Sequence, residues 1–244
     1  MHKQSAKKVI LVTGGSRGIG RAVVQKFQEE GWKVAACGTD ASRLVDSSAD
    51  FNFVCDVSQL EQVKQGVQKV VQEFGRIDAL VNNAGQTGND SMDPNTSDEN
   101  WHRAIQVNLY GTYAMSKQVI PHLPDHTGRI VNIASVLALK GVPDAIAYCA
   151  AKHGVVGLTR SLAQFLAPRK ITINAVCPGW VRTDMANARM QRIGVTEKDF
   201  ETSVPLGRFI EPSEIADFVH YLISAHGAAM ITGQALTLDG GFLT

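Results

Sequence analysis

Short hydrophobic runs alternate with amphipathic segments along the whole chain of 244 residues. Runs rich in β-branched residues predict strands at residues 8–14, 33–37, 51–56, 77–85, 129–135, 172–179 and 235–241. The segments between them are of helix length, and the first, residues 19–31, spaces its apolar residues three and four apart and ends in glycine. Because the strand runs are almost continuously apolar, the pattern predicts a parallel sheet buried under helices on both faces.

Composition favours one α/β domain over residues 1–244, since 44% hydrophobic and 19% charged content suits a single large core without linkers or repeats. The formal charge of +1 gives no general reason to expect nucleic acid or an anionic membrane as partner. No apolar run approaches the ~18 residues needed to span a bilayer, so we expect a cytoplasmic protein. Its four cysteines lack C-x-x-C spacing and are expected to be reduced and buried, and no metal site is predicted.

The stretch "TGGSRGIG", residues 13–20, lies where the first predicted strand ends and the first helix begins. Gly14, Gly18 and Gly20 would let the backbone turn tightly and approach a pyrophosphate at the helix N-terminus. The spacing is T-G-x-x-x-G-x-G, not the commoner G-x-G-x-x-G. Close packing of strand on helix also selects glycine, so this turn alone leaves a purely structural interpretation open.

Residues in the glycine turn and after the second and third strands bear on the choice of nucleotide. Arg17 can grip a 2′-phosphate with a bidentate guanidinium and Thr39 can add a hydroxyl, which favours NADP. Asp40 favours NAD instead, because a carboxylate at that point would bind the ribose 2′-hydroxyl. Asp56 follows the third strand and is either an acceptor for the adenine amino group or a turn residue.

The stretch "AYCAAKHGVVG", residues 147–157, places Tyr148 and Lys152 four apart, on one face of a predicted helix. A nearby cation favours the phenolate, so we expect Lys152 to lower the pKa of Tyr148 toward the working range of an acid–base catalyst. Proton exchange with a carbonyl or alcohol oxygen would then accompany hydride transfer to or from a nicotinamide. Taken alone, the pair is also compatible with a chance juxtaposition on a helix surface.

Several motifs together resemble the short-chain dehydrogenase/reductase family over essentially the full chain. They are "TGGSRGIG" at 13–20, "NNAG" at 82–85, "YCAAK" at 148–152 and "PG" at 178–179. Ser135 lies thirteen residues before Tyr148, which is the family's usual interval, and Asn108 in "VNLYGT" matches its helix asparagine.

This resemblance implies a catalytic group of Asn108, Ser135, Tyr148 and Lys152. Tyr148 would be the general acid in reduction, Lys152 would tune it and hold the ribose, Ser135 would bind the substrate oxygen, and Asn108 would hold a water for proton resupply. The cofactor-binding residues implied in this way are Gly14, Ser16, Arg17, Gly18, Ile19, Gly20, Thr39, Asp56, Val57, Asn82, Ala84, Gly85, Tyr148, Lys152, Pro178, Gly179, Val181 and Thr183.

Within the family, the C-terminal half is similar to reductases of β-ketoacyl thioesters, as in fatty acid biosynthesis. That similarity implies a substrate lid at about 181–209 and a homotetramer. Arg169 matches a basic residue that these enzymes use to dock acyl carrier protein, although at a helix end it also suits the dipole. His126 replaces a second docking arginine, which leaves coenzyme A as the other acyl carrier.

Three functions therefore stand as hypotheses. The first is NADPH-dependent reduction of a 3-oxoacyl thioester. The second, motivated by Asp40, is an NAD-dependent dehydrogenase of a hydroxy acid, sugar alcohol or other secondary alcohol. The third is a nucleotide-binding sensor or scaffold without chemistry, which the presence of both Tyr148 and Lys152 disfavours. The fold and the catalytic group do not specify the acyl-chain length, because many different substrates share them.

Overall fold

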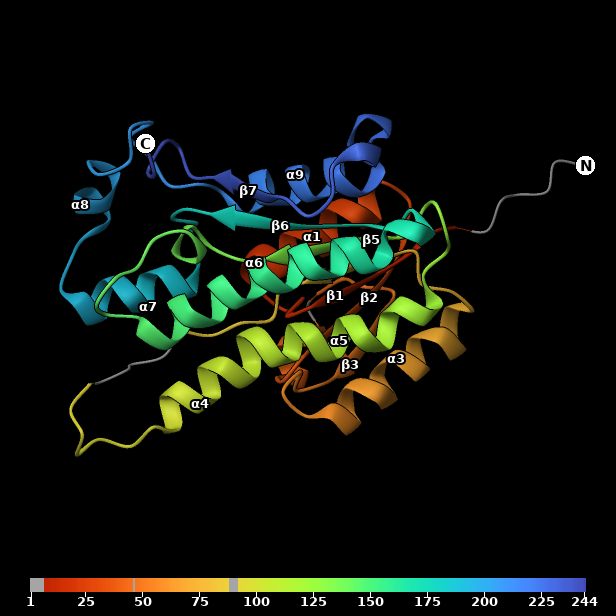
Figure 1. Cartoon of the computed structure of the whole chain (residues 1–244), viewed down its shortest axis with the longest axis horizontal. Helices are drawn as coiled ribbons and strands as arrows, with labels where there is room; N and C mark the ends of the chain where they lie inside the picture. Colours follow the sequence, from red (N-terminus) through yellow and green to blue (C-terminus); the bar gives the residue numbers. More distant parts are fainter. Residues whose placement is uncertain (1–6, 46, 88–91) are drawn as a thin grey trace, which may run out of the picture.

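A computed structural model describes residues 7–45, 47–87 and 92–244, and these form one α/β unit around a parallel sheet (Figure 1). All strand pairs are parallel, in the order β3-β2-β1-β4-β5-β6-β7. The strands are β1 (Val9–Thr13), β2 (Lys33–Gly38), β3 (Phe51–Val54), β4 (Ala79–Asn82), β5 (Arg129–Ile133), β6 (Thr172–Pro178) and β7 (Ala235–Leu238).

Each strand lies within or overlaps one of the predicted hydrophobic runs, so the predicted doubly wound α/β fold is confirmed. The central strands are apolar on both faces because both faces are covered: β1, β4 and β6 are buried at every position. β7 is only half-buried and forms one edge of the sheet.

Helices cover the two faces of the sheet (Figure 1). On one face, α1 (Gly18–Glu29) and α9 (Pro212–Ser224) pack against apolar residues of β1, β2, β4 and β5. On the other face, α3 (Leu60–Phe74), α5 (Gly111–Val119) and α6 (Ile146–Leu166) enclose a second core. The remaining α-helices are α2 (Ala41–Val45), α4 (Glu99–Ile105), α7 (Asp184–Ile193) and α8 (Glu197–Glu201).

The strand order reverses at β1, whose neighbours are β2 on one side and β4 on the other. In an open parallel sheet this arrangement leaves a crevice at the carboxyl ends of the strands, where the connections diverge. The glycine turn after β1, the segment after β4 and the start of α1 all meet at this crevice. The topology therefore places the candidate residues at one edge of the sheet.

The segment predicted as a substrate lid, residues 181–209, contains α7 and α8 and lies at one end of the sheet (Figure 1). Its two ends meet, because Val181 forms a bridge with Ile210. Trp180 and Phe200 pack with ring centroids 3.8 Å apart, which seats α8 against the start of the segment. Movement of this segment as a lid stays a prediction.

Candidate active site

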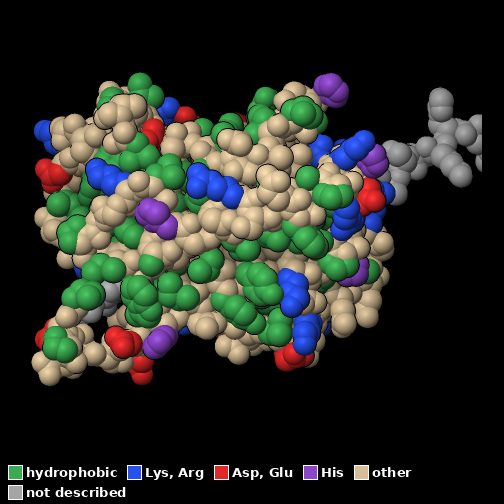
Figure 2. Space-filling view, in the orientation of Figure 1, with side chains coloured by type: hydrophobic (Ala, Val, Ile, Leu, Met, Phe, Trp, Pro, Cys, Tyr) green, Lys and Arg blue, Asp and Glu red, His purple; other side chains and the backbone are tan. Residues whose placement is uncertain are grey.

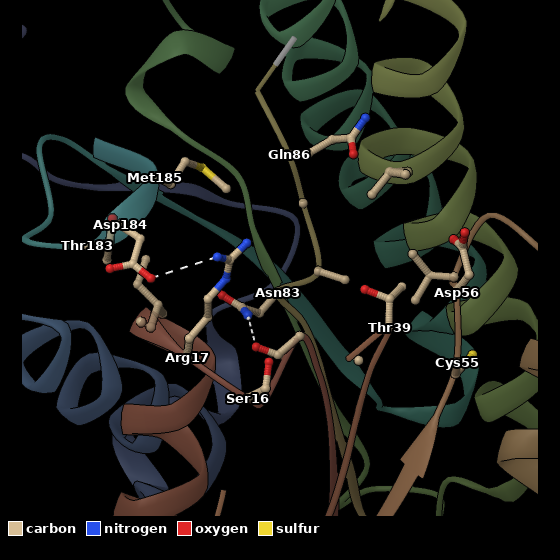
Figure 3. Close-up of a pocket in the computed structure, with 18 of the residues that line it drawn as sticks. Ser16, Arg17, Thr39, Cys55, Asp56, Asn83, Gln86, Thr183, Asp184 and Met185 are labelled. Carbon is tan, nitrogen blue, oxygen red and sulfur yellow. Dashed lines mark hydrogen bonds and ion pairs between the residues drawn. The ribbon is translucent and has the colours of Figure 1, made fainter. Parts of the chain in front are cut away.

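The first cavity lies at the carboxyl ends of β1, β2 and β4 (Figure 3). Eleven of the predicted cofactor-binding residues line it: Gly14, Ser16, Arg17, Gly18, Ile19, Thr39, Asp56, Val57, Ala84, Gly85 and Thr183. The prediction missed the others, which are Gly38, Cys55, Asn83, Gln86, Arg103, Val107, Asp184 and Met185. Most of these flank a predicted residue directly, whereas Arg103 and Val107 reach the cavity from the helical stretch around α4.

Three glycines of the turn lie at positions that a side chain could hardly occupy. Gly14 and Gly18 adopt positive φ values of 65° and 52°, which L-residues rarely accept. A Cβ at Gly20 would collide with the carbonyl of Gly14, so this glycine secures close packing of the turn on α1. Gly20 itself does not line the cavity, so we expect it to affect cofactor binding only by allowing the turn to take this shape.

Asn83 ties the segment after β4 to this turn. Its side-chain amide donates to the carbonyls of Thr13 and Gly14, each at 3.0 Å, and Thr13 Oγ1 accepts from the backbone amides of Asn83 and Ala84. These bonds join two loops that are distant in sequence into one wall of the cavity.

Asn82, predicted to line the cofactor, instead points into the protein. It is buried, and its Nδ2 donates to Ser116 Oγ at 2.9 Å and to Asn132 Oδ1 at 2.8 Å. Alternate residues of a strand face opposite sides. Asn82 therefore makes buried polar contacts, whereas the next residue, Asn83, lines the cavity. The prediction for Asn82 is thus corrected in favour of its neighbour.

The residues that would select the nucleotide lie on opposite sides of the cavity (Figure 3). Thr39 lines the wall after β2, while Arg17 reaches toward α7 and lies 3.7 Å from Asp184. Asp40 does not line the cavity; its Oδ1 accepts from the backbone amides of Ser42 and Arg43 and so caps α2. The carboxylate that favoured NAD is therefore engaged in helix capping.

Asp56 is held in place by donors around it. Ser58 donates its backbone amide and hydroxyl to Oδ1, and Arg103 of α4 donates to Oδ2 at 2.8 Å. Burial opposes ionisation, but the bonds from Ser58 and Arg103 outweigh it and keep the pKa of Asp56 below its ordinary value. An ionised, oriented acceptor therefore stands at the end of the cavity that α4 closes.

Tyr148 and Lys152 lie one turn apart on α6, as predicted, and both line a second cavity that adjoins the first. Lys152 is buried, its Nζ donates to the carbonyl of Ile133 at 2.7 Å, and it lies 5.5 Å from the centre of the Tyr148 ring. Ile19, Asn83, Gly85, Thr183 and Met185 line both cavities. The proton-exchanging pair thus sits next to the glycine turn.

The pKa shifts differ from the expectation drawn from the sequence. Burial raises the pKa of Tyr148 to about 12, with the Ser135 hydrogen bond and the charge of Arg189 acting in the opposite direction. Burial lowers the pKa of Lys152 to about 8. For the protein alone, burial therefore outweighs the lowering of the Tyr148 pKa that the sequence led us to expect, and a lowering by Lys152 in the cofactor-bound site stays a prediction.

Ser135 and Asn108 support this pair from two sides. Ser135 follows β5, hydrogen-bonds with Tyr148, and accepts the backbone amide of Leu137 at 3.1 Å. Asn108 lies in a π-helical turn, Gln106–Tyr110, between α4 and α5, a feature common at functional sites.

Asn108 holds the chain after β4 through both ends of its amide. Its Oδ1 accepts from the Gln86 amide at 3.1 Å, and its Nδ2 donates to the carbonyls of Gln86 and Ala104. A Cβ at Gly85 would lie 2.7 Å from Asn108 Oδ1 and 3.7 Å from Lys152 Nζ. Asn108 lines neither cavity, and the position that a Gly85 side chain would occupy lies near both Asn108 and Lys152.

The second cavity opens toward the predicted lid and is mainly apolar. Predicted residues at its wall are Ile19, Gly85, Ser135, Tyr148, Lys152, Pro178, Gly179, Val181 and Thr183. Those that the prediction did not name include Val142, Trp180, Arg189, Phe200 and Phe242. Phe242 belongs to the turn after β7, one residue beyond the predicted final strand, 235–241.

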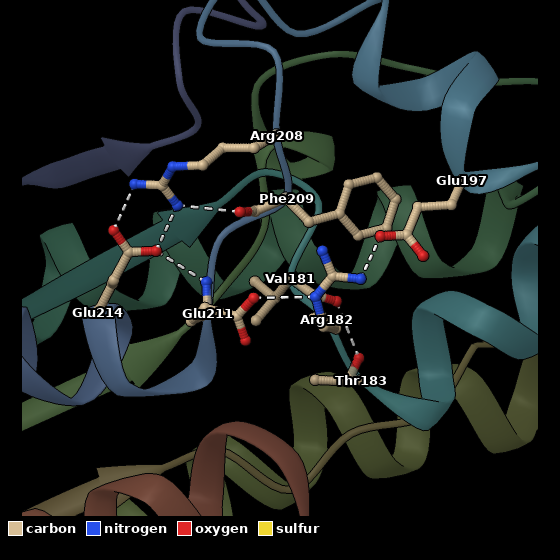
Figure 4. A network of polar contacts seen from close by, with 8 residues as sticks. All are labelled: Val181, Arg182, Thr183, Glu197, Arg208, Phe209, Glu211 and Glu214. Carbon is tan, nitrogen blue, oxygen red and sulfur yellow. Dashed lines mark hydrogen bonds and ion pairs between the residues drawn. The ribbon is translucent and has the colours of Figure 1, made fainter.

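A polar network fastens both ends of the lid segment (Figure 4). Arg182 donates to Glu211 at 2.9 Å and also bonds Glu197 of α8. Arg208 forms a bidentate pair with Glu214 of α9. The segment is therefore anchored where it leaves and rejoins the sheet, while α7 carries cavity-lining residues between these anchors.

Arg169, predicted to dock a carrier protein, is used inside the structure. Its Nε donates to Asp125, and its Nη1 and Nη2 donate to the carbonyls of Ile120 and Leu123. All three nitrogens thus close the end of α5, while the side chain is still 33% exposed, so docking of a carrier protein by Arg169 stays a prediction. His126, at the second docking position, has a positive φ of 68° and donates its backbone amide to the Arg169 carbonyl.

Cys37, Cys55, Cys149 and Cys177 are all buried and free, as expected. Within the described residues, no group of three His, Cys, Asp or Glu side chains is placed to hold a metal ion. No helix among them has the length and apolar character needed to cross a membrane.

A family model described as enoyl-(acyl carrier protein) reductase matches residues 14–243. A 3-oxoacyl-[acyl-carrier-protein] reductase, FabG, of Thermotoga maritima is 37% identical over 248 residues, covering 97% of this chain and 98% of that protein. The chain belongs to the short-chain dehydrogenase/reductase family. It is accordingly an NAD(P)-dependent oxidoreductase, related to enzymes that reduce ketones.

Solved structures agree on the fold and differ in substrate. A variant of actinorhodin polyketide ketoreductase, determined with NADPH, superposes with a TM-score of 0.89 at 37% identity and covers 97% of each chain. The aldohexose dehydrogenase of Thermoplasma acidophilum superposes with a TM-score of 0.88 at 36% identity, covering 97% of this chain and 94% of the other. Membership of the family therefore fixes the chemistry more firmly than the substrate.

Proposed function

We propose that this protein reduces a 3-oxoacyl thioester to the 3-hydroxyacyl thioester with NADPH. The observation that carries the proposal is the convergence of Ser135, Tyr148 and Lys152 on an apolar cavity that shares a wall with the glycine-turn cavity. Reduction of a ketone needs a hydride donor and a proton donor on the same carbonyl, and these two cavities are suited to hold them side by side.

The first cavity suits a dinucleotide, because the glycines of its turn bring bare backbone to the N-terminus of α1, where a pyrophosphate can bind. When bound, a reduced nicotinamide would supply the hydride to the carbonyl carbon. Tyr148 gives its proton to the carbonyl oxygen as that oxygen becomes an alkoxide, and Ser135 donates a hydrogen bond to the same atom. The ketone thereby gains one hydride and one proton and becomes a secondary alcohol.

The pKa values suit the direction of reduction. With a pKa of about 12, Tyr148 is protonated at neutral pH and is still more acidic than the alcohol that forms. Lys152, with a pKa of about 8, can release and recover a proton near neutral pH and so reprotonate the phenolate. Asn108 would link Lys152 to solvent through a bound water, a role its position behind Gly85 supports.

Thr39 favours NADPH, and so does Arg17, whose exposed side chain would turn from Asp184 to bind the 2′-phosphate with Thr39. Asp40, which caps α2, is not directed at the ribose. The similar polyketide ketoreductase, whose structure contains NADPH, supports the same choice. The alternative is an NAD-dependent dehydrogenase of a hydroxy acid, sugar alcohol or other secondary alcohol, and the similarity to aldohexose dehydrogenase supports it.

We also infer a homotetramer, as in the resembled reductases. Hydrophobic side chains gather over the face formed by α4, α5 and α6 (Figure 2). Trp101, Tyr113 and Phe165 of these helices are exposed, with Phe165 at 69%. A solution mass near that of one 26.3 kDa chain would contradict the tetramer.

The test follows loss of reduced-nicotinamide absorbance with acetoacetyl-coenzyme A, in parallel with NADPH and NADH. Fast turnover with NADPH supports the proposal, and the Tyr148→Phe variant should then lose nearly all activity while still binding NADPH. Crotonyl-coenzyme A serves as the control for enoyl reduction, the activity in the family model's description. Preference for NADH, or turnover only with secondary alcohols, would favour the alternative.

A further inference from the structure

Arg189 of α7 brings a cation to the wall of the substrate cavity. Its side chain is 13% exposed, lines the cavity together with Tyr148 and Ser135, and lies 5.1 Å from the centre of the Trp180 ring. Its charge is close enough to act on the phenol of Tyr148. The catalytic roles proposed above do not use this guanidinium.

Asp144 fixes the orientation of Arg189. The two carboxylate oxygens accept from Nε and Nη2, each at 2.9 Å, across 45 residues of sequence. Asp144 lies in the loop before α6, so this pair joins the lid segment to the helix that carries Tyr148. Such a bidentate pair holds a planar guanidinium in one plane, and the Trp180 ring supports it from the side.

One edge of the guanidinium remains available. Arginine has five N–H donors, and Nη1 of Arg189 donates to no other described residue. Asp144 also lies 3.7 Å from Arg192, so its charge is shared between two guanidinium groups. The apolar side chains around the open edge favour a neutral carbonyl acceptor over a carboxylate, whose burial there costs more. The rest of the cavity lining in this region is apolar, with Val142, Phe200 and Phe242.

We propose that Arg189 is a specificity-determining residue that donates a hydrogen bond to a second carbonyl oxygen of the substrate, the thioester carbonyl of a 3-oxoacyl group. The ketone oxygen would be held by Tyr148 and Ser135, and the thioester carbonyl, two carbons along the chain, would turn toward the Nη1 edge. This assignment rests on the proposed reduction of 3-oxoacyl thioesters. It explains how the site would distinguish a 1,3-dicarbonyl compound from a simple ketone.

The experiment compares two methyl ketones of similar size, ethyl acetoacetate with a second carbonyl and 2-hexanone without one, in wild type and variants with saturating NADPH. Hydrogen bonds to charged groups are worth about 1.5–3 kcal/mol, so Arg189→Met should lower kcat/KM for ethyl acetoacetate by roughly 10-fold or more. The same variant should change kcat/KM for 2-hexanone by less than about 3-fold. Arg189→Lys, which keeps the charge and loses the planar fork, should fall between the two.

Asp144→Asn is the control for anchoring of the lid segment, because it weakens the pairs of Asp144 with Arg189 and Arg192 and leaves the Arg189 donors present. We expect it to affect both ketones equally and to preserve the preference for ethyl acetoacetate. Equal losses on both ketones in Arg189→Met and Asp144→Asn would show that Arg189 only anchors the lid, and would overturn the assignment. A loss confined to free acetoacetate, with the ester unaffected, would overturn it in favour of a carboxylate site.

Failure of this inference can be told apart from failure of the proposed function. If wild type reduces acetoacetyl-coenzyme A and the Arg189 variants keep their preference, only the role of Arg189 is wrong. If wild type reduces no 3-oxo thioester, the proposed function fails and the assignment fails with it. Thermal melting of each variant confirms that the kinetic comparison is made on folded protein, and Arg189→Lys replaces Arg189→Met if the latter does not fold.

Discussion

Lys152 donates its buried ammonium to the carbonyl of Ile133 at the end of β5, 2.7 Å away. This bond holds a cation in an apolar environment beside Tyr148. The same burial lowers the pKa of the lysine and raises that of the tyrosine. The contribution of this pair to the free energy of unfolding therefore depends on pH.

Stability should vary with pH in a way that reveals both groups. Lys152 has an ordinary pKa of 10.5 and a folded pKa of about 8, so between these values the unfolded chain binds more protons and stability rises with pH. Tyr148 has an ordinary pKa of 10.0 and a folded pKa of about 12, so its contribution falls as pH rises above 10. Each tenfold difference in proton affinity is worth about 1.4 kcal/mol.

Urea unfolding from pH 7 to 11 checks this prediction. Relative to wild type, Lys152→Met should remove the rise between pH 8 and 10, while Tyr148→Phe should keep that rise and lessen the fall above pH 10. An unchanged rise in Lys152→Met would show that another group is responsible.

Asn83 and Asn82 should separate cofactor binding from stability. Asn83→Ala removes the two bonds to the Thr13 and Gly14 carbonyls at the turn, so we expect a several-fold weaker Kd for NADPH. Asn82→Ala leaves the buried Ser116 and Asn132 without this partner and should cost about 1–3 kcal/mol of stability with little change in Kd. Fluorescence titration with NADPH and urea unfolding of both variants measure the two effects, and a reversed pattern would contradict the structure.

These two asparagines also show how far the sequence could predict the site. The hydrophobic runs located every strand of the sheet, because a strand buried on both faces is recognisable from its own apolar residues. The elements that cover it need not be known. The motif "NNAG" located the right segment, but which asparagine faces the cavity depends on the strand's register. Sequence reasoning chose Asn82 and missed Asn83.

Contacts between distant segments were beyond the sequence for a similar reason. Arg169 appeared as an exposed cation because its partners, Asp125 and two backbone carbonyls, lie more than forty residues away. The sequence did not predict a role for Arg189, because its place in the cavity wall depends on contacts with Asp144 and Trp180. The direction of the Tyr148 shift depends on burial, which the spacing of Tyr148 and Lys152 does not reveal.

Arg17 should set the preference for NADPH. If it binds the 2′-phosphate, Arg17→Met should raise KM for NADPH roughly 10-fold or more and leave KM for NADH nearly unchanged. Asp184→Asn removes the exposed partner 3.7 Å away, and a pair so exposed contributes little, so NADPH preference should be kept or slightly increased. Steady-state kinetics with both nucleotides decides the matter, and equal effects on NADPH and NADH would remove Arg17 from the 2′-phosphate site.

Gly85 should be intolerant of even one methyl group. The Cβ of Gly85→Ala would lie 2.7 Å from Asn108 Oδ1, so Asn108 or the backbone after β4 must shift, and overpacking of this kind costs about 1–3 kcal/mol. Since Asn108 and Lys152 lie on either side of this position, kcat should fall more than tenfold while the protein still folds. Gly157→Ala on α6 is the matched control, because its Cβ meets nothing within 4 Å and helical alanine is favoured over glycine by roughly 0.5–1 kcal/mol. Activity and urea unfolding are measured for both variants. A normal kcat in Gly85→Ala would mean that the spacing between Asn108 and Lys152 does not govern proton transfer.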